Sequence, residues 1–366
     1  MRPLDESPTT MPKINLHDLE GFIARALAAA GMPGTDAACA AAVFAEADAS
    51  GVTTHGIARL GAYIGALEAG MINVAPKITV EGDDAIVVID GDNGLGPVVA
   101  SCAVEQAIKA AGRNGISLCL VRNSNHFGMA SFYTDRAAAA GMVCIAFSNA
   151  APTVAAHGGR TPVLGTNPIA AAAPGGHVQS GVSMDFATST VSRGRIRTAL
   201  RSGEALPEGW AVGPDGHPAR SAEDAMEGAL TGFGGPKGTG LAILADLLSG
   251  VLSGSAFSTL VGSMYGSRER AAGTGHAFLC IDIARARPEG DYPERWDRFA
   301  ATVRGSVPLE GVPDVVLPGD RRSHARMQAQ ADGVTVEASL WASCLSLAER
   351  LGIAPPLSDA DGGRSS

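Results

Sequence analysis

The segment GVTTHGIARL, residues 51–60, contains a histidine and an arginine four positions apart. If this turn is helical, His55 and Arg59 share one face and can converge on one ligand. Histidine titrates near neutrality and suits proton transfer to or from an oxygen, while the planar guanidinium of arginine binds a carboxylate at two points. The pair suggests chemistry beside a carboxylate, such as interconversion of a 2-hydroxy and a 2-oxo acid. On the spacing alone, a polar stripe on a surface helix is the better explanation, and both interpretations stay open here.

Three further segments carry polar groups that could face a ligand. His126, in NSNHFGMASF, lies between a predicted strand and a predicted helix, where α/β proteins collect ligands, although it could simply cap the helix. Thr166 lies in the turn GTNPIA, and Asp185 lies in the apolar strand SMDFATS, where a buried carboxylate needs a partner. Lys237, in GFGGPKGTG, precedes a predicted helix whose N-terminus would hold a phosphate or carboxylate; a plain loop is the alternative.

Familiar cofactor and metal motifs are missing from the sequence. No segment has the dinucleotide fingerprint GxGxxG at a strand-to-helix turn, and the lysine of GFGGPKGTG is followed by glycine rather than by the Ser or Thr of a phosphate loop. His55, His126 and His157 lack a close-spaced pair of ligands. We therefore predict neither a nucleoside triphosphatase nor a metal site.

Composition restricts the class of protein. The chain has 366 residues and a net charge of −9, which argues against a general nucleic-acid or anionic-membrane binder. No apolar run approaches the roughly 20 residues of a spanning helix, and MRPLDESPTT lacks the apolar core of a signal peptide. The six cysteines are scattered without a CxxC pair, as in proteins with buried reduced thiols. We predict a cytoplasmic protein that binds neither nucleic acid nor a membrane.

Hydrophobic periodicity predicts a helical first part of the chain, with helices at 14–31, 35–51 and 57–70, followed by a hairpin at 77–94. Helices and strands then alternate, which favours an α/β domain. Helices are expected at 97–115, 129–141, 190–203, 240–257 and 334–352, and strands at 115–123, 142–149, 181–188 and 276–284.

Several of these segments together carry a family resemblance. THGIARL, IDGDNGLG, VRNSNHFG, GTNPIA, MDFATSTVSRG, and GGPKG with LLSGVLSG occur in this order within residues 12–350. The sequence thereby resembles the malate/L-lactate dehydrogenase family, which lacks a Rossmann fold. Its members include malate, lactate, sulfolactate and ureidoglycolate dehydrogenases, diketogulonate reductase, and Δ1-piperideine- and Δ1-pyrroline-2-carboxylate reductases. The resemblance explains the missing fingerprint, because this family binds NAD(P) on an α/β domain of its own.

The resemblance implies a fold class and a domain organisation. We expect the non-Rossmann α/β fold of malate/L-lactate (sulfolactate) dehydrogenases, with two domains and a helical N-terminal lead-in. It also implies a homodimer in which the lead-in wraps the partner and the small-residue helix GLAILADLLSGVLSG suits a close contact. The expected parts are a disordered lead at 1–11, a helical substrate and dimerisation domain at 12–120 with 301–352, an NAD(P)-binding domain at 121–300 and a disordered tail at 353–366.

The resemblance also implies roles for residues of this chain. His55 matches the histidine that exchanges the proton, Arg59 matches the arginine that binds the substrate carboxylate, and Thr54 stands where the family usually has a serine that orients the histidine. Thr166 matches a substrate contact. In the ureidoglycolate branch the equivalent of His126 is the proton acceptor, so the general acid/base stays open between His55 and His126.

Cofactor-contacting segments are matched by four groups of residues. These are His126, Phe127, Gly128, Met129 and Ala130; Asp185, Phe186 and Ala187; Pro236 and Lys237; and Pro318, Gly319, Asp320 and Arg321 in the late loop LPGDRR.

One position separates the substrate branches. The imino-acid reductase branch carries an aspartate where this chain has Arg195, and the malate/lactate-like branch usually has a basic residue there, so Arg195 is assigned to substrate binding. We therefore expect an NAD(P)-dependent 2-hydroxyacid dehydrogenase, with NADPH-dependent reduction of cyclic imino acids as the alternative. The retained site residues argue against a third possibility, a non-catalytic protein that inherited the fold. The sequence does not choose between NAD and NADP, among substrates, or between reaction directions.

Overall fold

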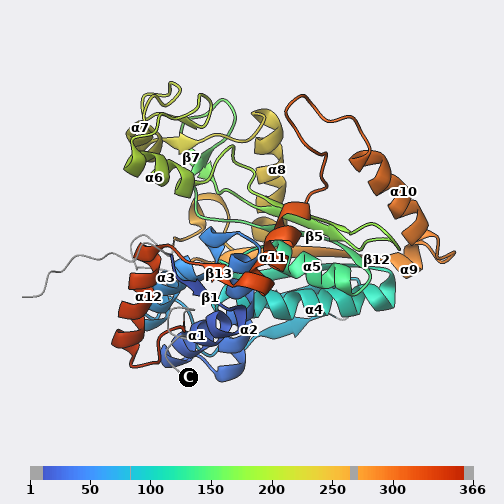
Figure 1. Cartoon of the computed structure of the whole chain (residues 1–366), viewed down its shortest axis with the longest axis horizontal. Helices are drawn as coiled ribbons and strands as arrows, with labels where there is room; N and C mark the ends of the chain where they lie inside the picture. Colours follow the sequence, from blue (N-terminus) through green and yellow to red (C-terminus); the bar gives the residue numbers. More distant parts are fainter. Residues whose placement is uncertain (1–10, 83, 264–270, 358–366) are drawn as a thin grey trace, which may run out of the picture. The chain divides into compact units, whose positions relative to one another are not determined.

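The structure, a computed structural model, describes residues 11–82, 84–263 and 271–357 (Figure 1). Most of the predicted lead at 1–11 and part of the predicted tail at 353–366 lie outside the described residues. The chain divides into two compact units, Met1–Glu68 with Arg321–Ser366, and Ala69–Asp320. These boundaries are not those of the substrate and cofactor domains expected from the sequence, which stay a prediction.

The first unit is helical, as the periodicity of its sequence predicts. The side chain of Asn15 caps the first helix by accepting the backbone N–H of Asp18 at 2.9 Å, and the stacked rings of Phe44 and Tyr63, 4.8 Å apart, join the second helix to the third. Its elements are β1 (Lys13–Ile14), α1 (Leu16–Ala29), α2 (Gly34–Ala49), the 3₁₀ turns η1 (Thr53–His55) and η2 (Ile57–Arg59), α3 (Leu60–Glu68), β13 (Val334–Thr335), which pairs with β1, and α12 (Ala338–Leu351); α11 (Asp320–Asp332) begins at the boundary.

The second unit is built on a mixed seven-stranded sheet in the order β2-β3-β4-β12-β5-β8-β9. Within it β3 and β4 run parallel, and the other neighbouring strands run antiparallel. The strands of this sheet are β2 (Thr79–Glu81), β3 (Ile86–Asp90), β4 (Ile116–Ser124), β5 (Met142–Ser148), β8 (Ile169–Ala173), β9 (Val182–Phe186) and β12 (Thr274–Asp282).

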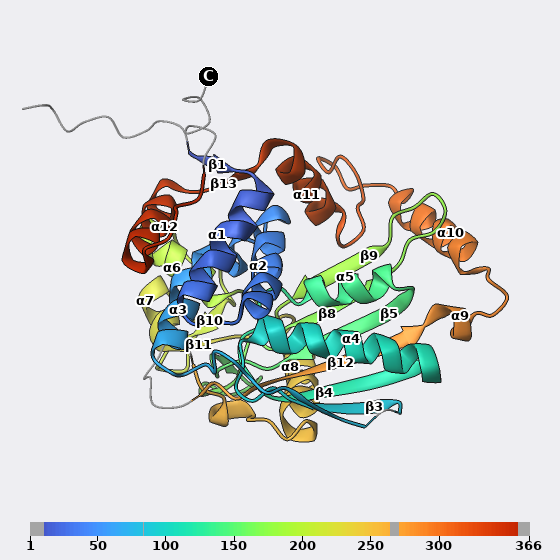
Figure 2. The same cartoon turned by 90° about the horizontal axis from the view of Figure 1, so that it is seen from below.

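Helices cover both faces of this sheet (Figures 1 and 2). α4 and α5 pack on one face, and α8 with the π-helical turn that follows it packs on the other. The second interface buries a core of Leu120, Phe147, Ile169, Ala245 and Ala277. The helices and turns of the unit are α4 (Gly96–Asn114), α5 (Ser131–Ala139), α6 (Arg193–Ser202), α7 (Ala222–Glu227), α8 (Pro236–Asp246), η3 (Leu247–Leu252), η4 (Ser258–Leu260), α9 (Ile283–Ala286) and α10 (Tyr292–Arg304).

A smaller four-stranded sheet, in the order β10-β11-β6-β7, packs with α6 and α7 around a separate core. Its strands are short and were not predicted from the sequence. They are β6 (Val154–Ala155), β7 (Pro162–Leu164), β10 (Ala211–Val212) and β11 (Ala229–Leu230).

The helix predicted at 240–257 differs from the observed one. α8 begins earlier, with Pro236 in its first turn, and the chain widens into a π-helical turn at Leu247–Leu252. This turn lies against β12 so closely that a Cβ at Gly275 would stand 1.6 Å from the carbonyl oxygen of Ser249. Among the described residues, no helix combines the length and the apolarity needed to cross a membrane.

Candidate active site

The segment between α2 and α3 carries the histidine and arginine singled out by their spacing, but its backbone is not one helix. His55 ends the turn η1 and Arg59 ends the turn η2, and the two turns are separated at Gly56, whose φ is −96° and ψ is −142°. The condition under which the pair would share one α-helical face is therefore not met. The two side chains are instead connected through hydrogen bonds to Thr54.

Thr54, His55 and Arg59 form a connected group. The Thr54 hydroxyl lies 2.9 Å from Nδ1 of His55, and the Nε of Arg59 donates to the Thr54 carbonyl oxygen at 2.6 Å. Burial, and then the positive charge of Arg59, lower the pKa of His55 to about 4. The imidazole is therefore neutral at physiological pH, with a hydroxyl partner on one nitrogen that fixes its orientation.

A buried carboxyl beneath this group was not singled out in the sequence. Asp48, near the end of α2, is only 5% exposed, and it accepts the backbone N–H of Ile57 at 2.7 Å. Burial raises the pKa of Asp48 to about 7, against the lowering effect of the Ile57 hydrogen bond. An acidic residue within the alanine-rich run FAEADAS was the available signal, because a charge at a core position of a helix needs a reason.

In the second unit, several residues matched to cofactor contacts meet at β9. Asp185 accepts the backbone N–H of Ser131 at 2.8 Å and the Ser131 hydroxyl at 3.1 Å, which supplies the partner that its carboxylate was predicted to need. Because Ser131 directly follows the segment His126–Ala130, this pair joins that segment to β9. Asp185 itself is half-buried rather than buried.

The late loop reaches the same strand. The carbonyl oxygen of Pro318 accepts the backbone N–H of Ser183 at 3.0 Å, and Gly319, at a φ of +102°, approaches so closely that a Cβ would lie 3.0 Å from the Ser183 carbonyl oxygen. Asp320 and Arg321 are not loop residues as predicted. They form the first turn of α11, where the Asp320 carboxylate accepts the backbone N–H of Leu317 at 2.9 Å.

The start of α8 is linked to both β9 and the Thr166 turn. Phe186, at the end of β9, meets Phe233 edge to face with ring centroids 5.9 Å apart. The carbonyl oxygen of Thr166 accepts from the backbone and hydroxyl of Thr188, whose own carbonyl accepts the backbone N–H of Phe233 at 3.0 Å. Arg195 lies outside this bonded group, exposed in the first turn of α6.

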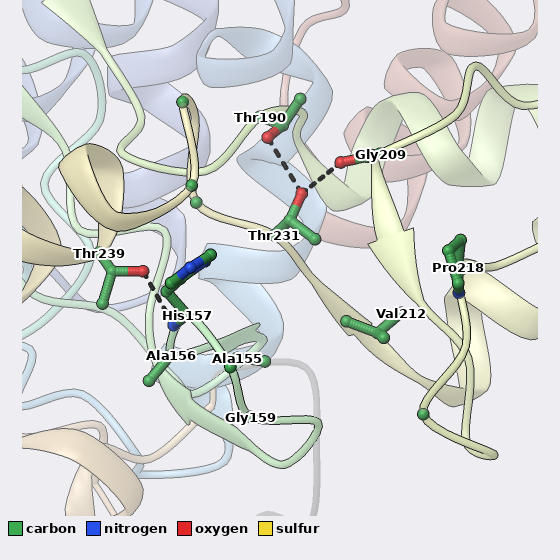
Figure 3. A pocket seen from close by; sticks show the side chains of 15 residues that line it. Ala155, Ala156, His157, Gly159, Thr190, Gly209, Val212, Pro218, Thr231 and Thr239 are labelled. Atoms are coloured by element: carbon green, nitrogen blue, oxygen red, sulfur yellow. Dashed lines mark hydrogen bonds between the residues drawn. The ribbon is translucent and has the colours of Figure 1, made fainter.

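Beside the N-terminus of α8 lies a cavity of about 590 Å³ (Figure 3). Its walls come from the glycine-rich turn before α8, from the smaller sheet, and from the loop carrying His157, whose backbone N–H donates to the Thr239 hydroxyl at 3.1 Å. The imidazole of His157 projects into the space drawn in Figure 3. Glycine-lined walls at a helix N-terminus suit a phosphate-bearing ligand, because backbone amides and the helix dipole favour negative charge.

His126 and its neighbours are held by a buried polar network. Nδ1 of His126 accepts the backbone N–H of Gly128 at 3.3 Å. The ring of Phe127 stacks on that of His276 with centroids 4.3 Å apart, and His276, fully buried in β12, lies 2.9 Å from the Ser148 hydroxyl at Nδ1 and 2.9 Å from the Ser124 hydroxyl at Nε2. His276 was not among the residues predicted from the sequence, although a histidine in the apolar run HAFLCIDIA is an available signal.

The remaining sequence-based expectations concern thiols and metals. Four of the six cysteines are buried, as predicted: Cys119, Cys144, Cys280 and Cys344. Across residues 11–82, 84–263 and 271–357, no three or more His, Cys, Asp or Glu side chains are grouped to hold a metal ion.

Comparison with known proteins adds the family context. Residues 14–344 match a family model described as malate/L-lactate dehydrogenase. L-sulfolactate dehydrogenase of Methanocaldococcus jannaschii is 37% identical over 324 residues, covering 88% of this chain and 92% of that protein. Malate dehydrogenase of Pyrococcus horikoshii is 38% identical over 313 residues, covering 83% and 84%.

Solved structures agree with these relatives. Sulfolactate dehydrogenase from Methanocaldococcus jannaschii superposes with a TM-score of 0.87 at 36% identity and covers 93% of this chain and 98% of that one. Δ1-piperideine-2-carboxylate reductase from Pseudomonas syringae superposes with a TM-score of 0.81 at 28% identity, with the same coverage. The fold expected from the sequence is confirmed.

We predict that His276 makes the stability of the protein fall in acid. Burial lowers the pKa of His276 to about 3. Between pH 6.5 and 3 the unfolded chain therefore binds a proton that the folded protein excludes, so folding stability is lost as the pH falls through this window. At about 1.4 kcal/mol per pH unit, wild type should lose about 2 kcal/mol more than His276→Gln between pH 7 and pH 5.

The measurement is urea-induced unfolding of both proteins at the two pH values. Exposed His217 provides the matched control, and His217→Gln should follow wild type. Equal losses of stability in wild type and His276→Gln would contradict the prediction.

Proposed function

The chain belongs to the malate/L-lactate dehydrogenase family, and we propose that it is an NAD(P)-dependent oxidoreductase interconverting a small 2-oxo acid and its 2-hydroxy acid. The observation that carries this proposal is the group Thr54, His55 and Arg59. It combines a neutral imidazole, a hydroxyl that orients it and a guanidinium, which are the parts needed to hold a carboxylate and move a proton on the adjacent oxygen.

In this proposal Arg59 binds the substrate carboxylate and thereby orients the neighbouring carbon and its oxygen. His55 takes the proton of the hydroxyl during oxidation and returns it during reduction. Because the pKa of His55 lies near 4, the side chain is ready to act as a base in the free protein, and the negative charge of a bound carboxylate would offset part of the Arg59 effect. The Thr54 hydroxyl, which can donate to Nδ1 or accept from it, holds the imidazole in one orientation.

The residues around β9 and α8 fit a dinucleotide cofactor. Lys237 supplies a positive charge, and the N-terminus of α8 supplies the positive end of a helix dipole, for a pyrophosphate beside the cavity of about 590 Å³. When bound, a nicotinamide cofactor supplies or accepts the hydride at the substrate carbon. The segments proposed to hold it are His126–Ala130, Asp185–Ala187, Pro236–Lys237 and Pro318–Arg321.

His126 is the competing general acid/base. Its Nδ1 already accepts a backbone N–H from Gly128, and its neighbour Phe127 is fixed on the buried His276. These contacts suit a residue that shapes a cofactor site. We therefore propose that His55 moves the proton and that His126 contributes to binding.

The substrate class is the finer part of the proposal. Relatives are named malate, L-lactate and L-sulfolactate dehydrogenases, and exposed Arg195 adds a second cation for an acidic substrate tail, alongside the proposed contact at Thr166. A cyclic imino acid is the second candidate substrate. It is favoured by the likeness to Δ1-piperideine-2-carboxylate reductase and by 31% identity to the Δ1-pyrroline-2-carboxylate reductase of Ancylobacter novellus.

We further propose that the protein acts in the cytoplasm as a homodimer. Large apolar side chains are exposed together on α8 and the turn after it, which suits contact with a second copy of the chain better than contact with water. Each of them is at least 40% exposed: Ile243, Leu244, Leu247, Val251 and Leu252.

The activity prediction is consumption of NADH or NADPH with pyruvate, oxaloacetate or 3-sulfopyruvate. His55→Ala should lower kcat/KM by about 100-fold or more, because it removes the general acid/base. His126→Ala should act mainly on the KM of the cofactor. Turnover restricted to Δ1-piperideine- or Δ1-pyrroline-2-carboxylate would establish the second candidate. No turnover with any acid and no cofactor binding would contradict the proposed function.

A pH profile tests the electrostatic link between Arg59 and His55. Burial is the larger cause of the low pKa of His55 and the Arg59 charge is the smaller, so Arg59→Gln should raise this pKa part of the way toward its usual 6.5. Between pH 7.5 and pH 5, kcat/KM for hydroxy-acid oxidation should stay nearly flat in wild type, and in Arg59→Gln it should begin to fall at the acid end of this range, because kcat/KM reports the free enzyme. Arg350→Gln, which removes an exposed arginine paired with Glu68, is the control and should keep the wild-type profile. Parallel profiles for all three proteins would refute the link.

The homodimer predicts a doubling of mass. Light scattering should give wild type about twice the 37.0 kDa of one chain. Leu247→Glu with Val251→Glu should yield monomers, because two charges would be buried in an apolar contact. Val307→Glu, at a side chain 93% exposed outside α8, should leave the dimer intact. A monomeric wild type, or a dimer unaffected by the paired substitutions, would contradict this surface.

A further inference from the structure

Asp48 lies directly under the turn that carries the proposed catalytic pair. It is the last residue but one of α2 (Gly34–Ala49), and its side chain turns into the first unit rather than toward solvent. Its carboxylate accepts the backbone N–H of Ile57 at 2.7 Å. Ile57 stands between the histidine and the arginine in the chain, and its own side chain is only 3% exposed.

The backbone of Gly56 also contacts the Asp48 carboxyl group. A Cβ built on Gly56 would lie 2.1 Å from the carboxylate carbon of Asp48, so the backbone at residue 56 rests against the carboxyl group. Gly56 is also the point where η1 ends and η2 begins. The carboxyl therefore holds the joint between the turn that ends in His55 and the turn that ends in Arg59.

Holding the turn with a buried carboxyl group lowers the stability of the folded protein. None of the salt bridges found among the described residues involves Asp48, and burial of a carboxylate without a cation is costly. The charge also reaches α12, where burial and then Asp48 raise the pKa of the Cys344 thiol to about 11. A buried, destabilising polar group placed against a candidate site points to a functional role.

We propose that Asp48 is a positioning residue for the reaction, because its bond to Ile57 fixes the Gly56 joint and thereby the aim of His55 and Arg59 at the substrate. The inference rests on the proposed function of that pair. Its physical basis is that the two short 3₁₀ turns have few backbone hydrogen bonds of their own, so an outside acceptor decides how one turn is set against the other.

The kinetic test compares two substitutions that differ in one property. Asp48→Asn keeps an oxygen acceptor of the same reach, and should retain kcat/KM within about threefold. Asp48→Ala removes the acceptor and should lower kcat/KM by at least about tenfold, because small misplacements of binding groups are costly. The loss should appear in the KM of the 2-oxo acid through Arg59 and in kcat through His55, while the KM of NAD(P)H stays unchanged.

Glu46 supplies a matched control on the same helix. Its carboxylate accepts from the Ser50 hydroxyl and pairs with Arg326 at 3.1 Å, so Glu46→Ala removes two contacts of α2 without touching the Gly56 joint. Glu46→Ala should keep wild-type kinetics. A loss in Glu46→Ala equal to that in Asp48→Ala, or full activity in Asp48→Ala, would overturn the proposal.

Hydrogen exchange gives a readout that does not require turnover. A peptide covering residues 53–59 should exchange at least about tenfold faster in Asp48→Ala than in wild type, with Asp48→Asn and Glu46→Ala unchanged. Equal exchange in wild type and Asp48→Ala would overturn the role of Asp48 whatever the activity. Faster exchange in Asp48→Ala from a wild type that turns over no acid would instead uphold the positioning of the turn and refute the proposed function.

A double-mutant cycle covers the case in which Asp48→Ala does not fold. Gly56→Ala forces a methyl group against the carboxyl and should by itself disturb the same joint. Asp48→Ser, which keeps a polar group too short to reach Ile57, makes room for that methyl group. The loss of kcat/KM and the gain in exchange from Gly56→Ala should therefore be smaller in the Asp48→Ser background than in wild type. Additive effects would overturn the proposal.

Discussion

Burial of the His55 imidazole beside the positive charge of Arg59 sets the chemistry available to the first unit. Burial first, and then the Arg59 charge, keep the ring unprotonated at neutral pH, while the Thr54 hydroxyl lies against one of its nitrogens. The same guanidinium is anchored on the Thr54 carbonyl oxygen, so the base and the carboxylate-binding group are parts of one hydrogen-bonded turn. A bound carboxylate changes both at once, because it satisfies the guanidinium and weakens the field that disfavours the imidazolium.

In the second unit, contacts around β9 and α8 could hold a dinucleotide without the usual glycine fingerprint. β9 lies at the edge of the seven-stranded sheet, where its residues bond to the start of α5 through Ser131 and to the late loop through Pro318. The aromatic contact of Phe186 with Phe233 then leads to the glycine-rich start of α8. In the proposed function, the helix N-terminus and Lys237 take the phosphates, as the first helix of a Rossmann fold does in other proteins.

Local patterns predicted the parts of this molecule that depend on local sequence. The hairpin at β2 and β3, the helix α4 with proline in its first turn, and the buried strands β4 and β5 follow from periodicity and end signals. The alanine strand β8 was missed, because Ile169–Ala173 has a composition that favours helix and becomes a strand only between β5 and β9. Strand direction in the sheet was likewise beyond local patterns.

The candidate site likewise has parts that could be predicted from the sequence and parts that could not. Residue types and family resemblance selected Thr54, His55 and Arg59, but their two-turn backbone depends on a contact between Gly56 and Asp48 that no spacing rule contains. A partner for the Asp185 carboxylate was predicted from its place in an apolar strand, although the side chain is only half-buried, and the identity of that partner, Ser131, was not predictable. His276 stands out in its apolar sequence, but its contacts could not be predicted, because they involve two serines from other strands.

In the proposed mechanism, Arg59 binds the substrate carboxylate while His55 exchanges the proton on the adjacent oxygen. A crystal structure with a nicotinamide cofactor and the unreactive 2-oxo acid analogue oxamate tests it most directly. The account predicts the oxamate carboxylate on the guanidinium of Arg59 and its carbonyl oxygen within hydrogen-bonding distance, about 3 Å, of the His55 ring. A carbonyl oxygen bound by His126 instead, or a carboxylate bound away from Arg59, would contradict the account.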